Sequence, residues 1–429
     1  MQTKDKKSHL VFLLPCLYAC ILSLLCACAE SKLPTDGDKA QGAAFLPAAR
    51  QELPVPAWQA QGETDVVYTM LPPERVHIDL CALGDIMAHN GTYEAAYSNG
   101  SYDFDYMFAD IARHIAGADY CVGNLETVFA GADRVFSNYP NFNTPEQMGQ
   151  SLGKVLGLDL LSMANNHVFD RGYSGMQTTM GFLDEYGIAY TGAYTSQEAY
   201  DTPFLADIQG IKVAFISSTY GVNGAVPRDH PYAVRITSRE ELSACAQAAV
   251  DAGADCVVAL LHWGNEYQPY ASQQQRELAQ WLFENTAVSL IIGNHAHVVQ
   301  PIEVFDVSYQ QQPKQGVVLY ALGNFTGEQL KEYRDSGIIA RIGLTITPGQ
   351  PAQAKVNSVT YTPTFIDPNP KASGKRYRVI SVYDAIAGYE SGTDNLISAK
   401  EYNRMLHYRE YYAGLLETHA LVRASIESE

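Results

Sequence analysis

Short apolar runs recur along residues 76–330, and most of them end in a cluster of polar side chains. Stretches with helical spacing, such as FDYMFADIARHIAG and QQQRELAQWLFENT, separate most of these runs. Strands that alternate with helices predict an α/β fold in which helices cover the sheets. Because such sheets bind ligands outside the carboxyl ends of their strands, the polar clusters predict one shared site.

The residue types at these strand ends are those that bind metals. Ordinary solvated loops carry Lys, Glu and Ser as often as other polar residues, whereas these ends carry Asp, Asn, Glu and His. The residues are Asp85, Asn124, Glu126, Asn165, Asn166, His167, His262, His295, His297 and Asn324. Carboxylates, amides and imidazoles together suit Mn²⁺, Zn²⁺ or Fe better than Ca²⁺, which prefers oxygen ligands alone.

The composition of this set predicts two divalent metal ions. In GNHAHVVQP, His295 and His297 are two residues apart, so an extended segment would point both imidazoles to one side. In VGNLETVF, Glu126 offers a carboxylate that can bridge two ions, and Asn124 offers an amide oxygen. Two ions would bind a phosphoryl oxygen and lower the pKa of a bridging water. The predicted metal ligands are Asp85, Asn124, Glu126, Asn166, His262, His295 and His297.

The stretch SMANNHVFDRG, residues 162–172, predicts a proton-transfer pair. With Asn166 as a ligand, His167 is free to donate a proton to a leaving group, and Asp170 can orient its imidazole. Both residues are therefore predicted to be catalytic.

Further polar residues are candidates for supporting roles around the ligands. His89, in GDIMAHN, is either a ligand or a residue that orients one. Glu266, in LLHWGNEY, is a possible ligand, although orienting a neighbour or facing solvent suits it better. Asn324 ends the last apolar run and is placed beside the ligands for that reason.

The N-terminus carries the pattern of a secretory signal. MQTKDKK is basic, and an apolar stretch follows from Leu10 to about Ala27. The segment ends in LLCACAES, in which Cys28 holds the acylated position of a bacterial lipobox. We predict a lipoprotein anchored to the cell membrane on its extracytoplasmic face. The alternative is a single uncleaved transmembrane anchor, since the apolar run is about long enough to span a bilayer.

Composition also predicts the domain borders. Residues 1–28 form the signal and lipobox, and residues 29–73, rich in Ala, Pro, Gln and Gly, form a flexible tether. Residues 74–337 form the α/β domain. Residues 338–429 form a β-rich extension of the same domain that ends in a long helix, roughly residues 396–427.

The charge balance limits the partners. Lys and Arg number 29 against 47 Asp and Glu, which gives a net charge of −18. Binding of duplex nucleic acid requires clustered Lys and Arg that release counterions, so nucleic acid is not expected as a partner. An anionic substrate would need a metal ion or a local basic groove. Arg134, Arg171 and Arg228 are loop candidates for such a groove, although arginines in loops are commonly solvated.

The motifs GDIMAHN, GNLET, ANNHVFDRG, LLHWGNEY, IIGNHAHVVQP and YALGNF, in this order, resemble those of the CapA family. These are bacterial capsule (poly-γ-glutamate) synthesis proteins within the calcineurin-like metallophosphoesterases. The resemblance covers about residues 76–330. It implies a four-layer α/β/β/α sandwich with a binuclear metal centre at the strand ends, and poly-γ-glutamate and capsule synthase subunits as partners.

The resemblance assigns places to the ligands and shows departures from the phosphoesterase pattern. Asp85 stands at the first metal-binding Asp, Asn166 and His167 at the Asn-His pair, and His262, His295 and His297 at the later histidines. Met87 replaces a histidine of the pattern, and Asn124 replaces a bridging Asp. Asn165 stands where related phosphoesterases have Gly, which predicts left-handed backbone geometry there.

The sequence leaves functions of different classes open. The first is an extracytoplasmic metal-dependent hydrolase, phosphoesterase-like, that acts in capsule synthesis or export on a phosphoester or on the γ-glutamyl polymer. The second is a non-catalytic subunit that keeps the fold, with a partly degraded metal site, to hold polymer or partner proteins.

Overall fold

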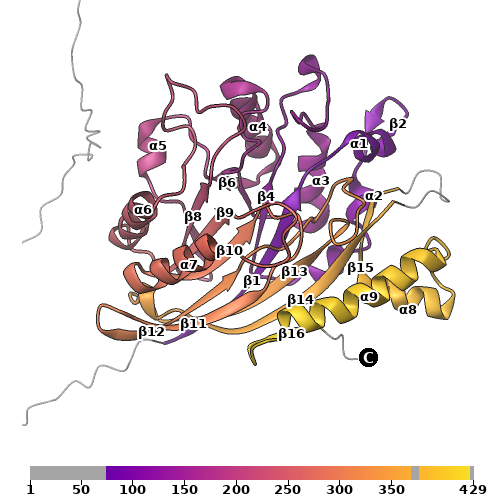
Figure 1. The fold of residues 1–429 in the computed structure, drawn as a ribbon. Coiled ribbons are helices and arrows are strands. Elements are labelled where there is room, and N and C mark those ends of the chain that lie inside the picture. The colour runs from indigo at the N-terminus through magenta and orange to yellow at the C-terminus, as the bar shows by residue number, and fades with distance from the viewer. Residues whose placement is uncertain (1–73, 369–375, 426–429) are drawn as a thin grey trace, which may run out of the picture. The chain divides into compact units, whose positions relative to one another are not determined.

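The computed structural model describes residues 74–368 and 376–425, and two large β-sheets form the centre of this part (Figure 1). The predicted signal, Cys28 and the tether lie outside the described residues. Among the helices of the described ranges, none combines the length and apolar character needed to cross a bilayer.

The larger sheet is mixed. It consists of β1 (Val76–Ile86), β4 (Tyr120–Leu125), β5 (Leu160–Ser162), β6 (Ala189–Thr191), β13 (Ser336–Ile346), β14 (Lys355–Asp367), β15 (Arg378–Ser381) and β16 (Val422–Ala424). The strand order is β15-β14-β13-β1-β4-β5-β6, and β16 pairs with β14. The strands from β1 to β6 in this order are parallel, so their carboxyl ends lie at one edge.

The second sheet has a parallel centre. It consists of β7 (Leu205–Ile208), β8 (Ile211–Thr219), β9 (Cys256–His262), β10 (Val288–Asn294), β11 (Ile302–Tyr309) and β12 (Gln312–Leu319). The order is β11-β12-β10-β9-β8-β7, with antiparallel strands at both edges and parallel strands between them. A separate small hairpin pairs β2 (Tyr97–Ser98) with β3 (Ser101–Tyr102).

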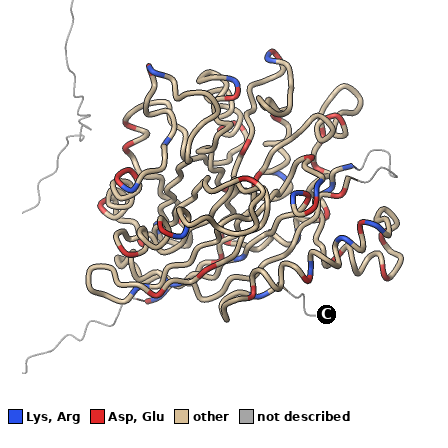
Figure 2. Tube along the Cα trace, in the orientation of Figure 1, with Lys and Arg blue, Asp and Glu red and all other residues tan. Residues whose placement is uncertain are grey.

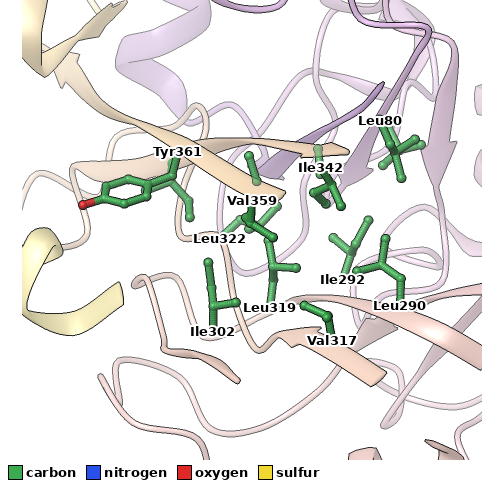
Figure 3. Packing of buried hydrophobic residues seen from close by; sticks show 14 of the residues in the cluster. Leu80, Leu290, Ile292, Ile302, Val317, Leu319, Leu322, Ile342, Val359 and Tyr361 are labelled. Carbon is green, nitrogen blue, oxygen red and sulfur yellow. The ribbon is translucent and has the colours of Figure 1, made fainter. Parts of the chain in front are cut away.

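Alternation of side chains along the strands builds the core between the sheets. On β1, Leu80 and Ala82 face the second sheet, whereas Cys81 and Leu83 face the opposite side. Leu290 and Ile292 of β10 pack into the same inner layer as Leu80 (Figure 3). Burial of an aliphatic side chain of this size contributes about 1.5–3 kcal/mol relative to its exposure.

Helices pack on both sheets, most of them on the outer faces. They are α1 (Asn90–Ala96), α2 (Asp105–Phe108), α3 (Gln147–Leu156), α4 (Gly172–Tyr186), α5 (Gln197–Asp201), α6 (Arg239–Asp251), α7 (Gln273–Asn285), α8 (Val382–Ser391) and α9 (Ala399–Leu416), with short 3₁₀ turns at Ala112–His114, Ala132–Arg134 and Pro351–Gln353. α3 and α4 pack on the larger sheet, and α6 and α7 on the second sheet. The layers confirm the predicted α/β/β/α sandwich.

Local sequence signals set the ends of these helices. Ser238 and Ser272 cap α6 and α7 by accepting a hydrogen bond from the backbone N–H three residues on. Gln275 completes a capping box at α7. Gly157 and Gly187 end α3 and α4 in the left-handed conformation that glycine adopts without strain.

The C-terminal region, predicted as a β-rich extension of the same domain, contributes strands to the larger sheet. β13 pairs with β1 and therefore lies inside the larger sheet, not beyond it. α8 and α9 run beside β14 and β15 (Figure 1), and their apolar residues join the core of the inner layer.

The last predicted helix is shorter than its sequence pattern suggests. α9 ends at Leu416, and the chain continues into β16. The carboxylate of Glu417 accepts hydrogen bonds from the Tyr361 hydroxyl (2.9 Å) and the Ala424 N–H (3.0 Å). These bonds turn the chain back onto β14, so the described part of the chain does not end in a helix.

Candidate metal centre

The strand ends of both sheets meet at one buried site. Asp85 on β1 pairs in register with Asn124 on β4, and Glu126 directly follows β4. His262 and Asn294, the last residues of β9 and β10, are register partners in the second sheet. The carboxyl ends of parallel strands thus bring residues from distant parts of the chain together, as the sequence predicts.

A glycine permits the approach of Asp85. A Cβ at Gly84 would lie 2.0 Å from the carbonyl oxygen of Gly323, so any side chain there would clash with backbone. With glycine in place, the Asp85 N–H donates to that same carbonyl at 2.9 Å. Asp85 also forms a parallel bridge with Asn324, which fixes its position at the end of the sheet.

The ligand-type side chains form two groups that share one carboxylate. Glu126, His262 and His295 offer atoms within 4.8 Å of one another, and so do Asp85, Glu126 and His297. Glu126 Oε1 lies 3.4 Å from His262 Nε2 and 3.7 Å from His297 Nε2. Because Glu126 belongs to both groups, it occupies the place of a bridging carboxylate.

Several buried polar atoms at this site have no hydrogen-bond partner among the described residues. They are both carboxylate oxygens of Glu126, Oδ1 of Asn124, Oδ1 of Asn294 and Nδ1 of His295. An isolated buried carboxylate is costly unless a cation or hydrogen-bond donors compensate it. Oxygen and imidazole nitrogen atoms are also the ligands that Mn²⁺, Zn²⁺ and Fe accept. The donor atoms of these residues fit a divalent metal ion.

Burial and charge perturb the carboxylates in opposite directions. Burial, with a smaller contribution from Asp85, raises the pKa of Glu126 well above its usual value. Burial also acts to raise the pKa of Asp85, but a hydrogen bond and charge from His297 outweigh it and lower that pKa to about 2. Asp85 is therefore ionised at neutral pH.

The pKa values of the histidines are also shifted in opposite directions. Burial lowers the pKa of His262 and of His295 to about 3, which keeps both imidazoles neutral and able to coordinate a metal. Burial also acts to lower the pKa of His297, but the carboxylates of Glu126 and Asp85 outweigh it and raise that pKa to about 9. His297 Nδ1 lies 3.2 Å from Asp85 Oδ2.

The HAH segment, residues 295–297, has a different backbone conformation from the extended one that was predicted. β10 ends at Asn294, and His295 and His297 have positive φ values of 94° and 55°. These are left-handed conformations that non-glycine residues adopt at a cost, and such strain is common at functional sites. The prediction of an extended segment was wrong, although both imidazoles lie at the cluster, one in each group.

The amides orient the ligands. Asn124 Nδ2 donates to Asp85 Oδ1 at 2.8 Å, while its own Oδ1 remains buried and unpaired among the described residues. Asn166 Oδ1 accepts from His262 Nε2 at 2.7 Å. Asn324 Oδ1 accepts from His297 Nδ1 at 2.9 Å and thereby sets the orientation of that imidazole.

Asn165 behaves differently from the prediction. It does not have the left-handed backbone that glycine would favour. Its Oδ1 accepts from the His167 N–H at 3.0 Å, an Asx turn, and its Nδ2 donates to the Leu125 carbonyl at 2.6 Å. Asn165 therefore fixes the loop that carries Asn166 and His167 against the end of β4.

The predicted proton-transfer pair is in contact. His167 Nδ1 lies 2.7 Å from Asp170 Oδ2, and that oxygen also accepts from the Phe142 N–H at 2.6 Å. The Phe142 ring packs edge-on against the imidazole at 4.7 Å. Asn223 Nδ2 lies 3.3 Å from His167 Nδ1. Phe142 and Asn223 were not predicted, because nothing in the sequence of their loops marks them. Asn294 could have been predicted from its place beside His295.

His89 and Glu266 lie outside both groups. His89 Nδ1 accepts from the Glu328 N–H at 3.2 Å, and burial lowers the pKa of this imidazole to about 4. Glu266 is exposed. Met87, at the position of the missing histidine, is buried beside Gly327, so the side chain packs and does not coordinate.

The layered fold and the shared carboxylate define a protein with a candidate divalent-metal centre at the strand ends of two sheets. Residues 79–329, more than half of the chain, match the family model described as "Bacterial capsule synthesis protein PGA_cap". The chain belongs to this family.

Named relatives agree with this assignment. The capsule biosynthesis protein CapA of Bacillus anthracis is 28% identical over 311 residues, which cover 67% of this chain and 72% of the relative. The PGA biosynthesis protein CapA of Bacillus subtilis (strain 168) is 26% identical over 270 residues, 58% of this chain and 68% of the relative. Among solved structures, a 5'-nucleotidase precursor from Thermus thermophilus aligns with a TM-score of 0.43 and 14% identity, over 67% of this chain and 54% of that chain.

Replacement of Glu126 by Gln is expected to weaken metal binding at both groups at once. Gln keeps the shape of Glu but offers no negative charge, and Glu126 serves both groups. Affinity should fall by more than the roughly 10–100-fold that loss of an outer hydrogen-bond partner costs. Metal analysis after dialysis and titration calorimetry with Mn²⁺ or Zn²⁺ measure the loss. His77→Ala, at an exposed imidazole on β1, is the control, and unchanged metal content in Glu126→Gln would contradict the shared role.

Metal affinity is expected to rise with pH up to about pH 9. His297 has a pKa of about 9, so it holds a proton at neutral pH that a metal must displace, and the raised pKa of Glu126 acts in the same direction. Each displaced proton lowers the affinity about tenfold per pH unit below the pKa of its group. Calorimetry in buffers of different ionisation enthalpy measures the released protons. Affinity that is independent of pH, without proton release, would show that His297 and Glu126 do not coordinate.

Proposed function

We propose that this chain is a metal-dependent hydrolase of bacterial capsule synthesis or export, with poly-γ-glutamate or a phosphoester as its substrate. The observation that carries the proposal is the buried Glu126 carboxylate, which has no hydrogen-bond partner in the described ranges and is common to both ligand groups. Membership of the capsule synthesis family supports the biological setting. The names of the Bacillus relatives agree with it.

Different residues of this chain have different roles in the proposed reaction. Glu126, Asp85 and the histidines of the two groups would hold the metal ions, which when bound supply Lewis-acid activation of substrate and water. His167 donates a proton to the leaving group. Asp170 holds Nδ1 of that imidazole at 2.7 Å, which leaves Nε2 as the nitrogen that faces the substrate.

The surroundings of His167 favour proton transfer. Its side chain is only 6% exposed, and the Phe142 ring covers one side of the imidazole. Exclusion of water strengthens the electrostatic interaction with Asp170. The backbone N–H of Phe142 holds the same carboxylate oxygen, so the pair is oriented before a substrate arrives.

One observation favours a second function, a non-catalytic subunit that holds polymer or synthesis partners. Asn124, at the place of a bridging Asp, donates an N–H to Asp85 and brings no negative charge to the site. Fewer carboxylates weaken the retention of two divalent ions. The two functions differ in whether loss of His167 changes a rate.

His167→Ala is expected to lower the turnover number by about 10²–10⁴-fold while metal content stays unchanged, since the imidazole serves as general acid and not as a ligand. Hydrolysis of a generic phosphodiester and of poly-γ-glutamate by the metal-loaded protein is the measurement. Asp170→Asn should cause a smaller loss because the imidazole remains, and His77→Ala should cause none. A metal-loaded wild-type protein that hydrolyses neither substrate would favour the non-catalytic subunit.

We further propose that the protein acts on the outer side of the cell membrane, anchored by a lipid on Cys28. The support is the basic start, the apolar stretch and the lipobox-like LLCACAES. Cys28→Ser should remove acylation and block processing of the signal, whereas Cys26→Ser, in the same segment but before the acylated position, should leave both intact. Radiolabelled lipid incorporation and the mass of the membrane-bound protein measure the effect. Acylation that persists in Cys28→Ser would contradict this anchor.

A further inference from the structure

We propose that Arg334 binds a carboxylate of the substrate beside the metal centre, so that the site selects γ-linked glutamyl chains. This inference deepens the proposed function and rests on it for the place where the substrate is held. Arg334 was not predicted as a site residue from the sequence, and it lies in the charged stretch EQLKEYRDSG before β13.

The Arg334 guanidinium stacks on the ring of Tyr267, which lies beside His297. The guanidinium carbon lies 3.3 Å from the centroid of the Tyr267 ring, and that ring lies 5.8 Å from the ring of His297. Tyr267 is itself fixed, because its N–H donates at 2.7 Å to the carbonyl of Ala296, which stands between the two histidines of the HAH segment. Stacking on an aromatic face orients a guanidinium and leaves its N–H edge free to bind.

The backbone of Arg334 is tied to the same ligand group. Asn324 Nδ2 donates to the Arg334 carbonyl at 2.7 Å, while Asn324 Oδ1 accepts from His297 Nδ1 at 2.9 Å. The Asn324 side chain therefore positions both the His297 imidazole and the backbone of Arg334. A cation held in this way loses little conformational entropy when it binds an anion.

α9 fixes the residues on both sides of Arg334. The Tyr408 hydroxyl accepts from the Tyr333 N–H at 2.7 Å and donates to Asp335 Oδ1 at 2.6 Å. Arg404 forms an ion pair with the other oxygen of Asp335 at 2.6 Å. These contacts give Tyr408 of α9 a structural role and hold the segment that carries Arg334.

The guanidinium of Arg334 is available for a ligand. It is half-buried, and it has no hydrogen-bond or ion-pair partner within residues 74–368 and 376–425. By contrast, the loop arginines Arg134 and Arg171 donate to neighbouring carbonyl and hydroxyl oxygens. Lys and Arg are otherwise scattered among Asp and Glu along the chain (Figure 2). The oriented guanidinium of Arg334 would let a chain of net charge −18 bind an anion at this place.

The chemistry of the guanidinium indicates the ligand. Its N–H groups match the two oxygens of a carboxylate, and such charge-assisted pairs are about twice as strong as neutral hydrogen bonds. A γ-linked glutamyl chain keeps one free carboxylate on every residue, so one of them can reach Arg334 while a neighbouring bond lies at the metal centre. A phosphate group shares this oxyanion chemistry and is the alternative source that the experiment separates.

The test is the binding of a short γ-linked glutamyl oligomer, measured by calorimetry on the metal-loaded protein. Arg334→Gln is expected to weaken binding by about tenfold or more, the equivalent of one charge-assisted pair. Arg334→Lys should recover part of the loss. Lys331→Ala removes the same charge from an exposed side chain three residues earlier and should leave affinity unchanged. The oligomer with its carboxylates amidated should bind all four proteins weakly and equally.

Several results would overturn the inference. They are wild-type protein that does not bind the oligomer, equal losses in Arg334→Gln and Lys331→Ala, or a loss in Arg334→Gln for inorganic phosphate alone. Oligomer binding that depends on Arg334 supports the inference even if no substrate is hydrolysed, in which case only the proposed hydrolase activity fails. Unfolding midpoints within about 2 °C of each other exclude a folding defect as the cause.

Discussion

The uncompensated carboxylate of Glu126 is the constraint on which the site depends. Both of its oxygens are buried without a hydrogen-bond partner among the described residues, and burial raises its pKa. In an apolar interior such a group either binds a proton or faces a cation. The neutral imidazoles of His262 and His295 on one side, and Asp85 with His297 on the other, supply what a cation needs. The fold's layers, glycine contacts and strained histidines all serve to hold these atoms together.

Much of the site follows from the sequence because strand ends are encoded locally. An apolar run followed by a polar cluster predicts both the strand and the place where it stops. Parallel strands then bring Asp85 and Glu126 to one edge of the larger sheet, and His262 lies at the end of a strand of the second sheet. The alternation of strands and helices predicts an α/β fold with covered sheets. The four-layer arrangement was predicted from the resemblance to the CapA family. Glu126 could be singled out because it is the one carboxylate in its motif able to bridge two ions.

Other features depend on contacts that no local pattern encodes. Phe142, Asn223 and Arg334 lie in loops of ordinary composition, and only the packing of those loops brings them to the site. The left-handed backbone at His295 and His297 is uncommon for non-glycine residues, and the GNHAHVVQP pattern did not predict it. The central place of β13 is a matter of strand order, which hydrophobic periodicity does not determine.

The place of β13 also means that the working unit is longer than the segment that defines the family. The family match ends at residue 329, yet β1, which carries Asp85, has β13 as its neighbour on one side. A chain cut at that border would leave β1 as an open edge with unpaired backbone groups, the kind of edge that invites aggregation. During synthesis β1 also remains an open edge until residues 336–346 have emerged. The first strand of the domain can therefore pair on this side only after a strand from late in the chain has been synthesised.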